Sequence, residues 1–269
     1  MLNRISILIL ALCAVALGRA EPTLLDKGYR QMYNLQFAEA HQTFHEWQGL
    51  HPDDPMGAAS DAAAYLFSEF DRLHILQSEF FVHDQHFITK HNLIPDPSLK
   101  RSFEAALEAS RGLSIRAPGT KNAMFASILC IGLHSDYLAL IEERYVASFG
   151  EMKAGRALAE KLLAADPQFY DAWLAVGVEN YMLSIRPAPV RWILRLQGAQ
   201  TDRALGLEKL RLTAEKGHYL APFARLLLAV AALRDHDTNR ARDLLAGLVV
   251  EFPGNSLYAQ ELTGLKLQH

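Results

Sequence analysis

The fold of this chain is decided by residues 24–55, which read LLDKGYRQMYNLQFAEAHQTFHEWQGLHPDDP. Two small residues, a bulky apolar residue and a proline follow one another here at spacings of 12, 4 and 8 residues. They are Gly28, Ala40, Phe44 and Pro52. This pattern is typical of two antiparallel helices joined by a tight turn, because small side chains let the backbones cross closely and a proline ends the second helix.

The same four-residue pattern returns near the end of the chain. Ala229, Ala241, Leu245 and Pro253 keep the spacings of 12, 4 and 8 residues. A single hairpin of this kind cannot bury its apolar face, so it must stack on neighbouring hairpins. The two occurrences therefore predict an all-α fold built from stacked helix hairpins.

These residues resemble the tetratricopeptide repeat family, whose unit of about 34 residues has small, small, bulky and proline positions in this order. Trp173 and Gly177 are four residues apart and resemble the first helix of a third unit. The segment from Arg186 to Gly217 resembles the divergent outer-membrane and inclusion-clearance branch of the family. The resemblance implies a right-handed superhelical array whose first helices line a concave groove, and a protein-binding role.

The first twenty residues have the pattern of a secretory signal peptide. Arg4 supplies the positive charge, residues 5–17 form an apolar run, and residues 18–20 form a cleavage site with small residues. We expect a periplasmic or secreted protein, with a retained N-terminal membrane anchor as the alternative.

The rest of the chain, residues 21–269, is predicted to form one helical domain with a capping helix over 256–269. Its middle, residues 55–118, fits the repeat poorly, because His74 stands where a small crossing residue is expected and the helices look too long. Further on, the pattern predicts separate helices over 120–134, 136–148 and 151–165.

The charge balance and the cysteines exclude some classes of protein. The chain has 27 Lys and Arg against 30 Asp and Glu. Loss of the signal peptide would remove two of these basic residues and no acidic one. The excess of acidic side chains argues against nucleic-acid binding, which relies on a basic surface. The same cleavage would leave Cys130 without a partner for a disulfide, and a single thiol in an apolar run behaves as a small apolar residue.

The repeat register predicts which side chains face the groove. They are apolar, with tyrosine hydroxyls as the polar groups, which favours an apolar segment or an amphipathic helix of a partner protein as the ligand. The alternatives are that this stripe is core, or that the chain's own helices fill the groove. The predicted groove residues are Leu25, Tyr29, Met32, Tyr33, Leu174, Val178, Tyr181, Met182, Phe223, Leu226, Val230 and Leu233.

A second candidate surface lies in the region from Ser184 to Lys216, where Pro187 and Pro189 interrupt the helix. Arg186, Arg191, Trp192 and Arg195 combine an aromatic ring with basic groups. Such a patch suits an acidic partner or the anionic headgroups of a membrane, which gives a peripheral membrane contact. The alternative is an insertion whose Trp192 packs on the neighbouring repeat.

Histidines offer a competing, metal-binding interpretation. Glu79, His83 and His86 are spaced at i, i+4 and i+7 and would share one helix face. His45-Glu46 begins a zinc-protease motif, but Gly49 stands where its second histidine must be.

No catalytic motif is recognised in the sequence. We therefore expect a non-enzymatic binding scaffold that needs no cofactor and recognises a protein or peptide, with homo-oligomer formation left open.

Overall fold

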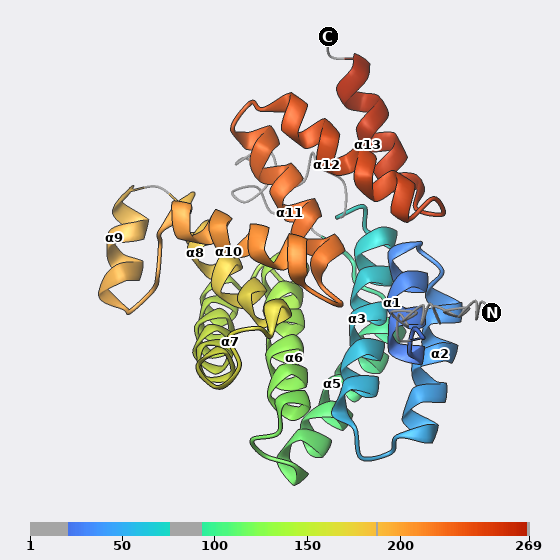
Figure 1. Ribbon diagram of the computed structural model, residues 1–269. Coiled ribbons are helices and arrows are strands. Elements are labelled where there is room, and N and C mark those ends of the chain that lie inside the picture. The colour runs from blue at the N-terminus through green and yellow to red at the C-terminus, as the bar shows by residue number, and fades with distance from the viewer. Residues whose placement is uncertain (1–20, 76–92, 187, 268–269) are drawn as a thin grey trace, which may run out of the picture.

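The computed structural model describes residues 21–75, 93–186 and 188–267, and every regular element in these ranges is helical. The predicted all-α class is thus confirmed. The predicted signal peptide and the histidine cluster at Glu79, His83 and His86 lie outside the described residues. The helices are α1 (Leu24–Tyr33), α2 (Phe37–Leu50), α3 (Pro55–Arg72), α5 (Pro97–Arg116), α6 (Lys121–Leu140), α7 (Tyr145–Ala165), α8 (Trp173–Ser184), α9 (Ala188–Leu196), α10 (Arg203–Lys216), α11 (Ala221–Arg234), α12 (Thr238–Glu251) and α13 (Ser256–Leu267), with a 3-10 turn at Tyr170–Ala172 (Figure 1).

Most helix starts are fixed by a side chain that accepts a backbone N–H bond in the first turn. Thr23 and Asp26 form a capping box on α1, and Asp54 and Asp96 each precede a proline at the start of α3 and α5. At the start of α12, the Asp237 carboxylate accepts from the backbone N–H of Arg240 at 3.1 Å. These caps satisfy donors that the helix itself leaves unpaired.

The helices pack in pairs that follow the order of the chain. α1 packs on α2, α3 on α5, α6 on α7, α8 on α10 and α11 on α12, while α13 covers α12. Successive pairs are joined by contacts of α2 with α3, α5 with α6, α7 with α8 and α10 with α11. Each pair therefore buries on its neighbour the apolar face that it cannot cover alone.

The first pair crosses at the glycine that the sequence pattern singled out. A Cβ atom added to Gly28 would overlap the ring of Phe44, which is fully buried against it. Ala40, one helical turn before Phe44, is also fully buried. The predicted close approach of α1 and α2 is therefore present, and Gly28 is the residue that permits it.

The pair formed by α8 and α10 repeats this crossing, although an inserted segment hides it in the sequence. A Cβ atom on Gly177 would lie 3.0 Å from Leu210, and one on Gly206 would lie 2.6 Å from the backbone nitrogen of Tyr181. Gly206 and Leu210 are four residues apart, as Ala40 and Phe44 are. The segment that carries α9 separates them from Gly177, so the regular spacing is lost.

Three helices end in the same left-handed turn without a glycine. Leu35, His74 and His236 have φ angles of 61°, 59° and 60°. At the first of these, Leu35 and Gln36 donate to the carbonyls of Met32 and Gln31 at 2.9 Å each, and matching bonds surround the other two. The turns satisfy carbonyls at the helix ends, which offsets the strain of a left-handed residue that has a side chain.

Residues near the two ends of the domain lie side by side. The backbone N–H of Gly254 donates to the Asn34 side chain, and the Asn255 side chain donates to the carbonyl of Tyr33, both at 2.9 Å. Tyr33 also donates its hydroxyl to the carbonyl of Tyr219 at 3.0 Å. The first helix pair thus contacts the turn that follows α12.

The predicted helix boundaries between residues 120 and 165 are wrong in two places. α6 continues to Leu140 and α7 begins at Tyr145, so the breaks expected near 135 and 149 do not occur. No proline stands between residues 121 and 165 to force a break, and the Ser135 hydroxyl bonds the carbonyl and the hydroxyl of Ser148 at 3.1 and 3.0 Å across the two helices. In the middle segment, α3 and α5 have 18 and 20 residues, as long as the sequence led us to expect.

The crossing predicts opposite effects for two glycine-to-alanine substitutions. Gly28→Ala should destabilise the fold by about 1–3 kcal/mol, because the added methyl group overpacks the contact with Phe44. Gly247→Ala in α12 has open space around the new Cβ and should stabilise by about 0.5–1 kcal/mol. Urea denaturation measures both changes, and an equal effect of the two substitutions would contradict the crossing.

Candidate binding cleft

Two adjoining hollows open between the helix pairs. An inner chamber has a volume of about 90 Å³ and an outer cleft about 580 Å³. Asp136, Met152, Val178 and Phe223 line both hollows, so the two share one wall. The volume of the outer cleft falls within the range of about 300–1,000 Å³ that is typical of ligand sites.

The outer cleft is lined by residues of several successive helix pairs. α6, α7, α8, α9 and α11 supply most of its wall, and Leu245 of α12 and Glu261 of α13 extend it. Most of the side chains are apolar, so the cleft favours a ligand with an apolar surface. The apolar lining includes Leu140, Val146, Phe149, Val178, Met182, Val190, Ile193, Leu194, Phe223, Leu226, Val230 and Leu233.

Most of the groove residues that the repeat register predicts line one of these two hollows. Those of α8 and α11 line the cleft or the chamber: Leu174, Val178, Met182, Phe223, Leu226, Val230 and Leu233. Those of α1 that line the inner chamber are Tyr29, Met32 and Tyr33. Leu25 and Tyr181 line neither hollow and are buried in the core, Tyr181 against α10.

Tyr29 and Tyr33 were expected to offer their hydroxyls to a ligand, but the structure places both in the core. The Tyr29 ring stacks on Tyr219 with 4.7 Å between centroids, and its hydroxyl accepts a bond from Ser60 at 3.2 Å. Tyr33 uses its own hydroxyl on the carbonyl of Tyr219. Burial raises the pKa of both phenols. These rings therefore hold α1 to the rest of the fold.

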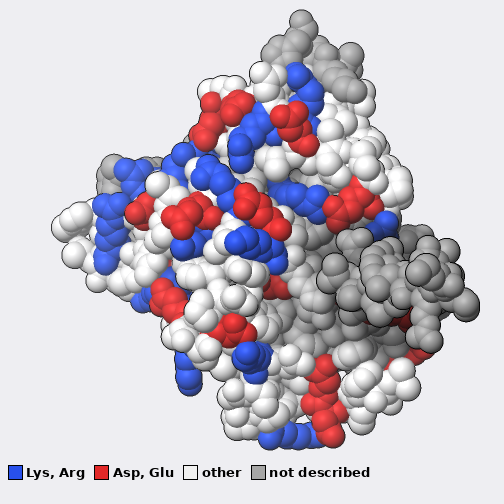
Figure 2. Space-filling view, in the orientation of Figure 1, with Lys and Arg blue, Asp and Glu red and all other residues white. Residues whose placement is uncertain are grey.

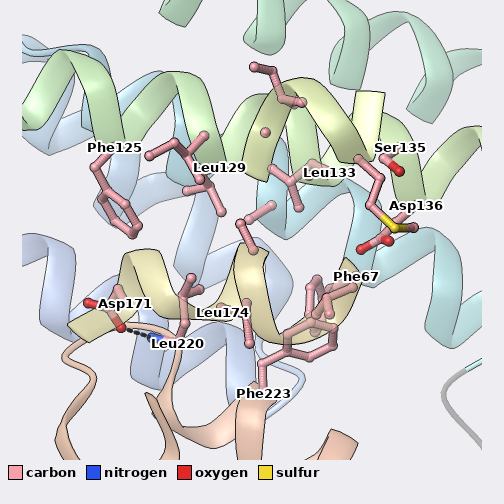
Figure 3. A pocket seen from close by; sticks show the side chains of 18 of the residues that line it. Phe67, Phe125, Leu129, Leu133, Ser135, Asp136, Asp171, Leu174, Leu220 and Phe223 are labelled. Carbon is pink, nitrogen blue, oxygen red and sulfur yellow. Dashed lines mark hydrogen bonds between the residues drawn. The ribbon is translucent and has the colours of Figure 1, made fainter. Parts of the chain in front are cut away.

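Asp136 is the ionisable residue that the two hollows share. Its carboxyl projects from α6 toward the space beside Phe67 and Phe223 (Figure 3). No hydrogen bond or ion pair joins it to any described residue, and the loss of hydration alone raises its pKa to about 7. One feature of the sequence indicates that Asp136 faces the apolar side of α6. It falls three residues after Leu133 and seven after Leu129, on the same helix face.

The other ionisable groups of the inner chamber have partners inside the fold. Glu151 pairs with His134 at 3.1 Å. Asp171 is buried and accepts backbone N–H bonds from His218, Tyr219 and Leu220 at 3.0, 3.2 and 2.9 Å, which anchors the start of α11 (Figure 3). Despite these bonds, burial raises the pKa of the Asp171 carboxyl.

His134, Ser135 and Asp136 point to three different surroundings, as expected for consecutive residues of a helix. His134 meets Glu151, Ser135 meets Ser148, and Asp136 faces the cavity. They do not form a catalytic relay, because such a relay requires the three side chains to be bonded in series.

α9 forms one wall of the outer cleft and also carries the predicted arginine and tryptophan patch. Arg191 donates to the carbonyls of Ser184 and Arg186 at 3.2 and 2.9 Å, and Arg195 donates to the Thr201 hydroxyl. Trp192 is 65% exposed to solvent. Both arginines thus attach α9 to the fold, while the tryptophan lies on the solvent side.

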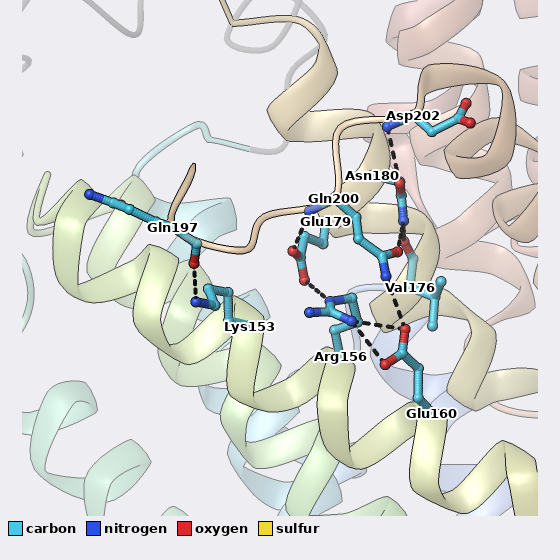
Figure 4. Close-up of polar contacts among 9 residues, drawn as sticks. All are labelled: Lys153, Arg156, Glu160, Val176, Glu179, Asn180, Gln197, Gln200 and Asp202. Carbon is cyan, nitrogen blue, oxygen red and sulfur yellow. Dashed lines mark hydrogen bonds and ion pairs between the residues drawn. The ribbon is translucent and has the colours of Figure 1, made fainter. Parts of the chain in front are cut away.

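A buried polar network holds the segment after α9 in place (Figure 4). Glu179 is fully buried, pairs with Arg156 at 2.7 Å and accepts the backbone N–H of Gln200 at 3.1 Å. The Asn180 amide bonds the Gln200 side chain at 2.9 Å and accepts from the backbone N–H of Asp202 at 3.1 Å. A network with every member satisfied fixes its geometry, so the α9 wall is preorganised.

The surface charges are mixed on the face that Figure 2 shows. Basic and acidic side chains alternate over α10 to α12. This mixture does not produce the broad basic surface by which proteins displace counterions from nucleic acid.

Two histidines of α2 share one buried carboxylate. His41 and His45 of α2 bond the two carboxylate oxygens of the buried Asp61 at 2.5 and 3.0 Å. No group of three His, Cys, Asp or Glu residues placed to hold a metal ion occurs among the described residues. Cys130 is buried, as expected, and burial raises its pKa to about 11.

Comparison with protein-family models, with curated proteins and with solved structures finds no match to this chain. Among the described helices, α6 alone is long and apolar enough to cross a membrane by length and composition. It is largely covered, since it packs on α3, α5 and α7.

The unpaired carboxyl predicts a pH dependence of stability. Because the folded chain holds the Asp136 proton up to a pKa of about 7, whereas an unfolded aspartate releases it near its ordinary value of 3.8, ionisation should lower the stability as pH rises between these values. Asp136→Asn removes this effect. We expect its melting temperature, relative to the unmodified protein, to rise from pH 4 to about pH 7 and then to level off.

The matched control for this measurement is Asp243→Asn, which changes an exposed carboxyl on α12. Its difference from the unmodified protein should stay constant over the same range. A constant difference for Asp136→Asn as well would show that water solvates this carboxyl freely.

Proposed function

We propose that this protein is a non-enzymatic binding scaffold that receives an apolar or amphipathic segment of a partner protein in its outer cleft. The observation that carries the proposal is the cleft of about 580 Å³ with a mainly apolar wall. An apolar wall of this size gains free energy when a ligand displaces its water.

The extent of the wall favours a polypeptide as the ligand. The lining runs from α6 through α9 and α11 to α12 and α13, so the cleft follows successive helix pairs. A helix with apolar residues on one face can lay that face along such a groove and place a side chain against each pair. The role agrees with the resemblance to tetratricopeptide repeats, in which first helices line the binding groove.

The proposed compartment is the cell envelope or the exterior of the cell. The signal-peptide pattern of residues 1–20 supports a periplasmic or secreted protein, and the partner would then be a protein of the cell envelope. We include the superhelical, tetratricopeptide-like arrangement of the helix pairs in this proposal. It rests on the two matching patterns and on the repeated glycine crossings.

Two exposed cleft residues provide a test that spares the core. Val146 and Ile193 line the cleft and are 87% and 51% exposed. Val146→Glu combined with Ile193→Glu should weaken partner binding at least about tenfold, because charges would have to be desolvated in the interface. Crosslinking from position 193 in the native compartment identifies the bound segment, whose synthetic peptide is then titrated by fluorescence anisotropy.

The control is Val250→Glu, which changes an apolar side chain that is 83% exposed on α12 and lies outside the cleft lining. Both variants should melt within a few degrees of the unmodified protein. If the peptide binds the cleft variant and the control equally well, the outer cleft is not the binding site.

A second candidate function is contact with a membrane surface through the solvent side of α9. Trp192 and Leu196 are 65% and 69% exposed, next to the basic residues Arg191 and Arg195. Exposed tryptophan and leucine beside arginine suit the interface of an anionic bilayer. Because both arginines also bond within the fold, the aromatic and aliphatic groups give the cleaner test.

Trp192→Ser combined with Leu196→Ser should reduce co-sedimentation with vesicles rich in phosphatidylglycerol several-fold, because it removes the apolar groups that would enter the bilayer. Val250→Ser serves as the matched control. An unchanged bound fraction would remove the membrane from consideration.

A further inference from the structure

The position of Asp136 cannot be explained by the stability of the fold. Its carboxyl lies where the inner chamber meets the outer cleft, and the described side chains that share this wall with it are Met152, Val178 and Phe223. An unpaired carboxylate among apolar groups costs free energy, and none of the described residues brings a cation to it to offset that cost. A bound group of the right charge would offset it.

We infer that the outer cleft selects a partner segment that carries one lysine or arginine within an apolar face, and that this cation pairs with Asp136. The inference rests on the proposed function and specifies its ligand. The apolar wall takes the aliphatic stem and the neighbouring side chains of the segment, while the carboxylate takes the charged end.

The other charged groups around the two hollows do not compete for this role. In the inner chamber, Glu151 is paired with His134 on α6, and Asp171 is bound by backbone N–H groups at the start of α11. In the outer cleft, Arg186 and Glu261 have interactions of their own, and Tyr145 lies beside Glu143 and Arg186. None of these groups contributes to the pKa of Asp136, which burial alone raises.

A neutral carboxyl could instead donate a hydrogen bond to an acceptor on a ligand, and pH separates the two cases. A cation requires the ionised form, so its affinity should increase about tenfold from pH 6 to pH 8 if the pKa of the empty site is about 7. An acceptor requires the protonated form, so its affinity should fall over the same range.

The test uses the purified protein and two synthetic amphipathic helices of leucine, alanine and glutamine. One helix has a single lysine at the centre of its apolar face, and the other has methionine there. Titration calorimetry at pH 6 and pH 8 measures both against the unmodified protein, Asp136→Asn, Ile193→Glu and the control Asp243→Asn.

At pH 8 we expect the lysine peptide to bind the unmodified protein and the Asp243→Asn control at least tenfold more tightly than the methionine peptide. Asp136→Asn should reduce this preference to less than twofold while it keeps the affinity for the methionine peptide. Because this substitution removes a group that is costly when ionised, the variant is expected to fold.

Equal binding of the two peptides, with both lost in Ile193→Glu, would overturn the pairing with Asp136 and leave the proposed apolar cleft in place. Tighter binding at pH 6 would also overturn it, in favour of an acceptor ligand. Failure of both peptides to bind at all would overturn the inference and the proposed function together. Concentration-dependent dimers that Ile193→Glu abolishes, measured by sedimentation, would assign the cleft to a second copy of the chain instead.

Discussion

The close crossing of paired helices is the constraint on which the rest of the structure depends. At Gly28 the ring of Phe44 takes the space of a side chain, and at Gly206 the backbone of Tyr181 does so. Dispersion attraction falls steeply with distance, so crossings this close give each short pair enough contact to offset much of the entropy lost on ordering it. Each pair is then a rigid unit whose remaining apolar face must be covered by the next pair, or by a ligand.

The predicted groove residues are core on α1 and form part of an open wall on α8 and α11. Near α1, the turn after α12 and the residues before α11 close on Tyr29 and Tyr33, which fills the trough with the chain's own rings. Between α6, α9 and α11 the walls stand apart, because the α9 insertion is fixed to α8 by Arg191 and to α7 by the network around Glu179. The hollow is thus held open by polar bonds on its outer side.

Asp136 costs the fold free energy when it is ionised, but it offers a charged group to a ligand. The positions one and two turns earlier on its helix face are Leu133 and Leu129, and an apolar residue at 136 would suit the wall equally well. A residue that weakens the fold at neutral pH, in a cavity, is typical of sites where stability has been exchanged for recognition. The carboxyl gives the cleft a preference for charge that its apolar walls cannot provide.

The sequence by itself determined the helical class, the first helix crossing and the lining residues that come from α1, α8 and α11, because each depends on spacings within one helix pair. Only the tertiary structure decided that Tyr29 is core, that α6 continues through Ser135, and that Gly177 and Gly206 meet although α9 interrupts their spacing. It also decided that Asp136 faces a cavity in which no described residue pairs with it. These features depend on which distant helix packs opposite each residue, and the periodicity of one helix carries no information about the neighbour that will cover it.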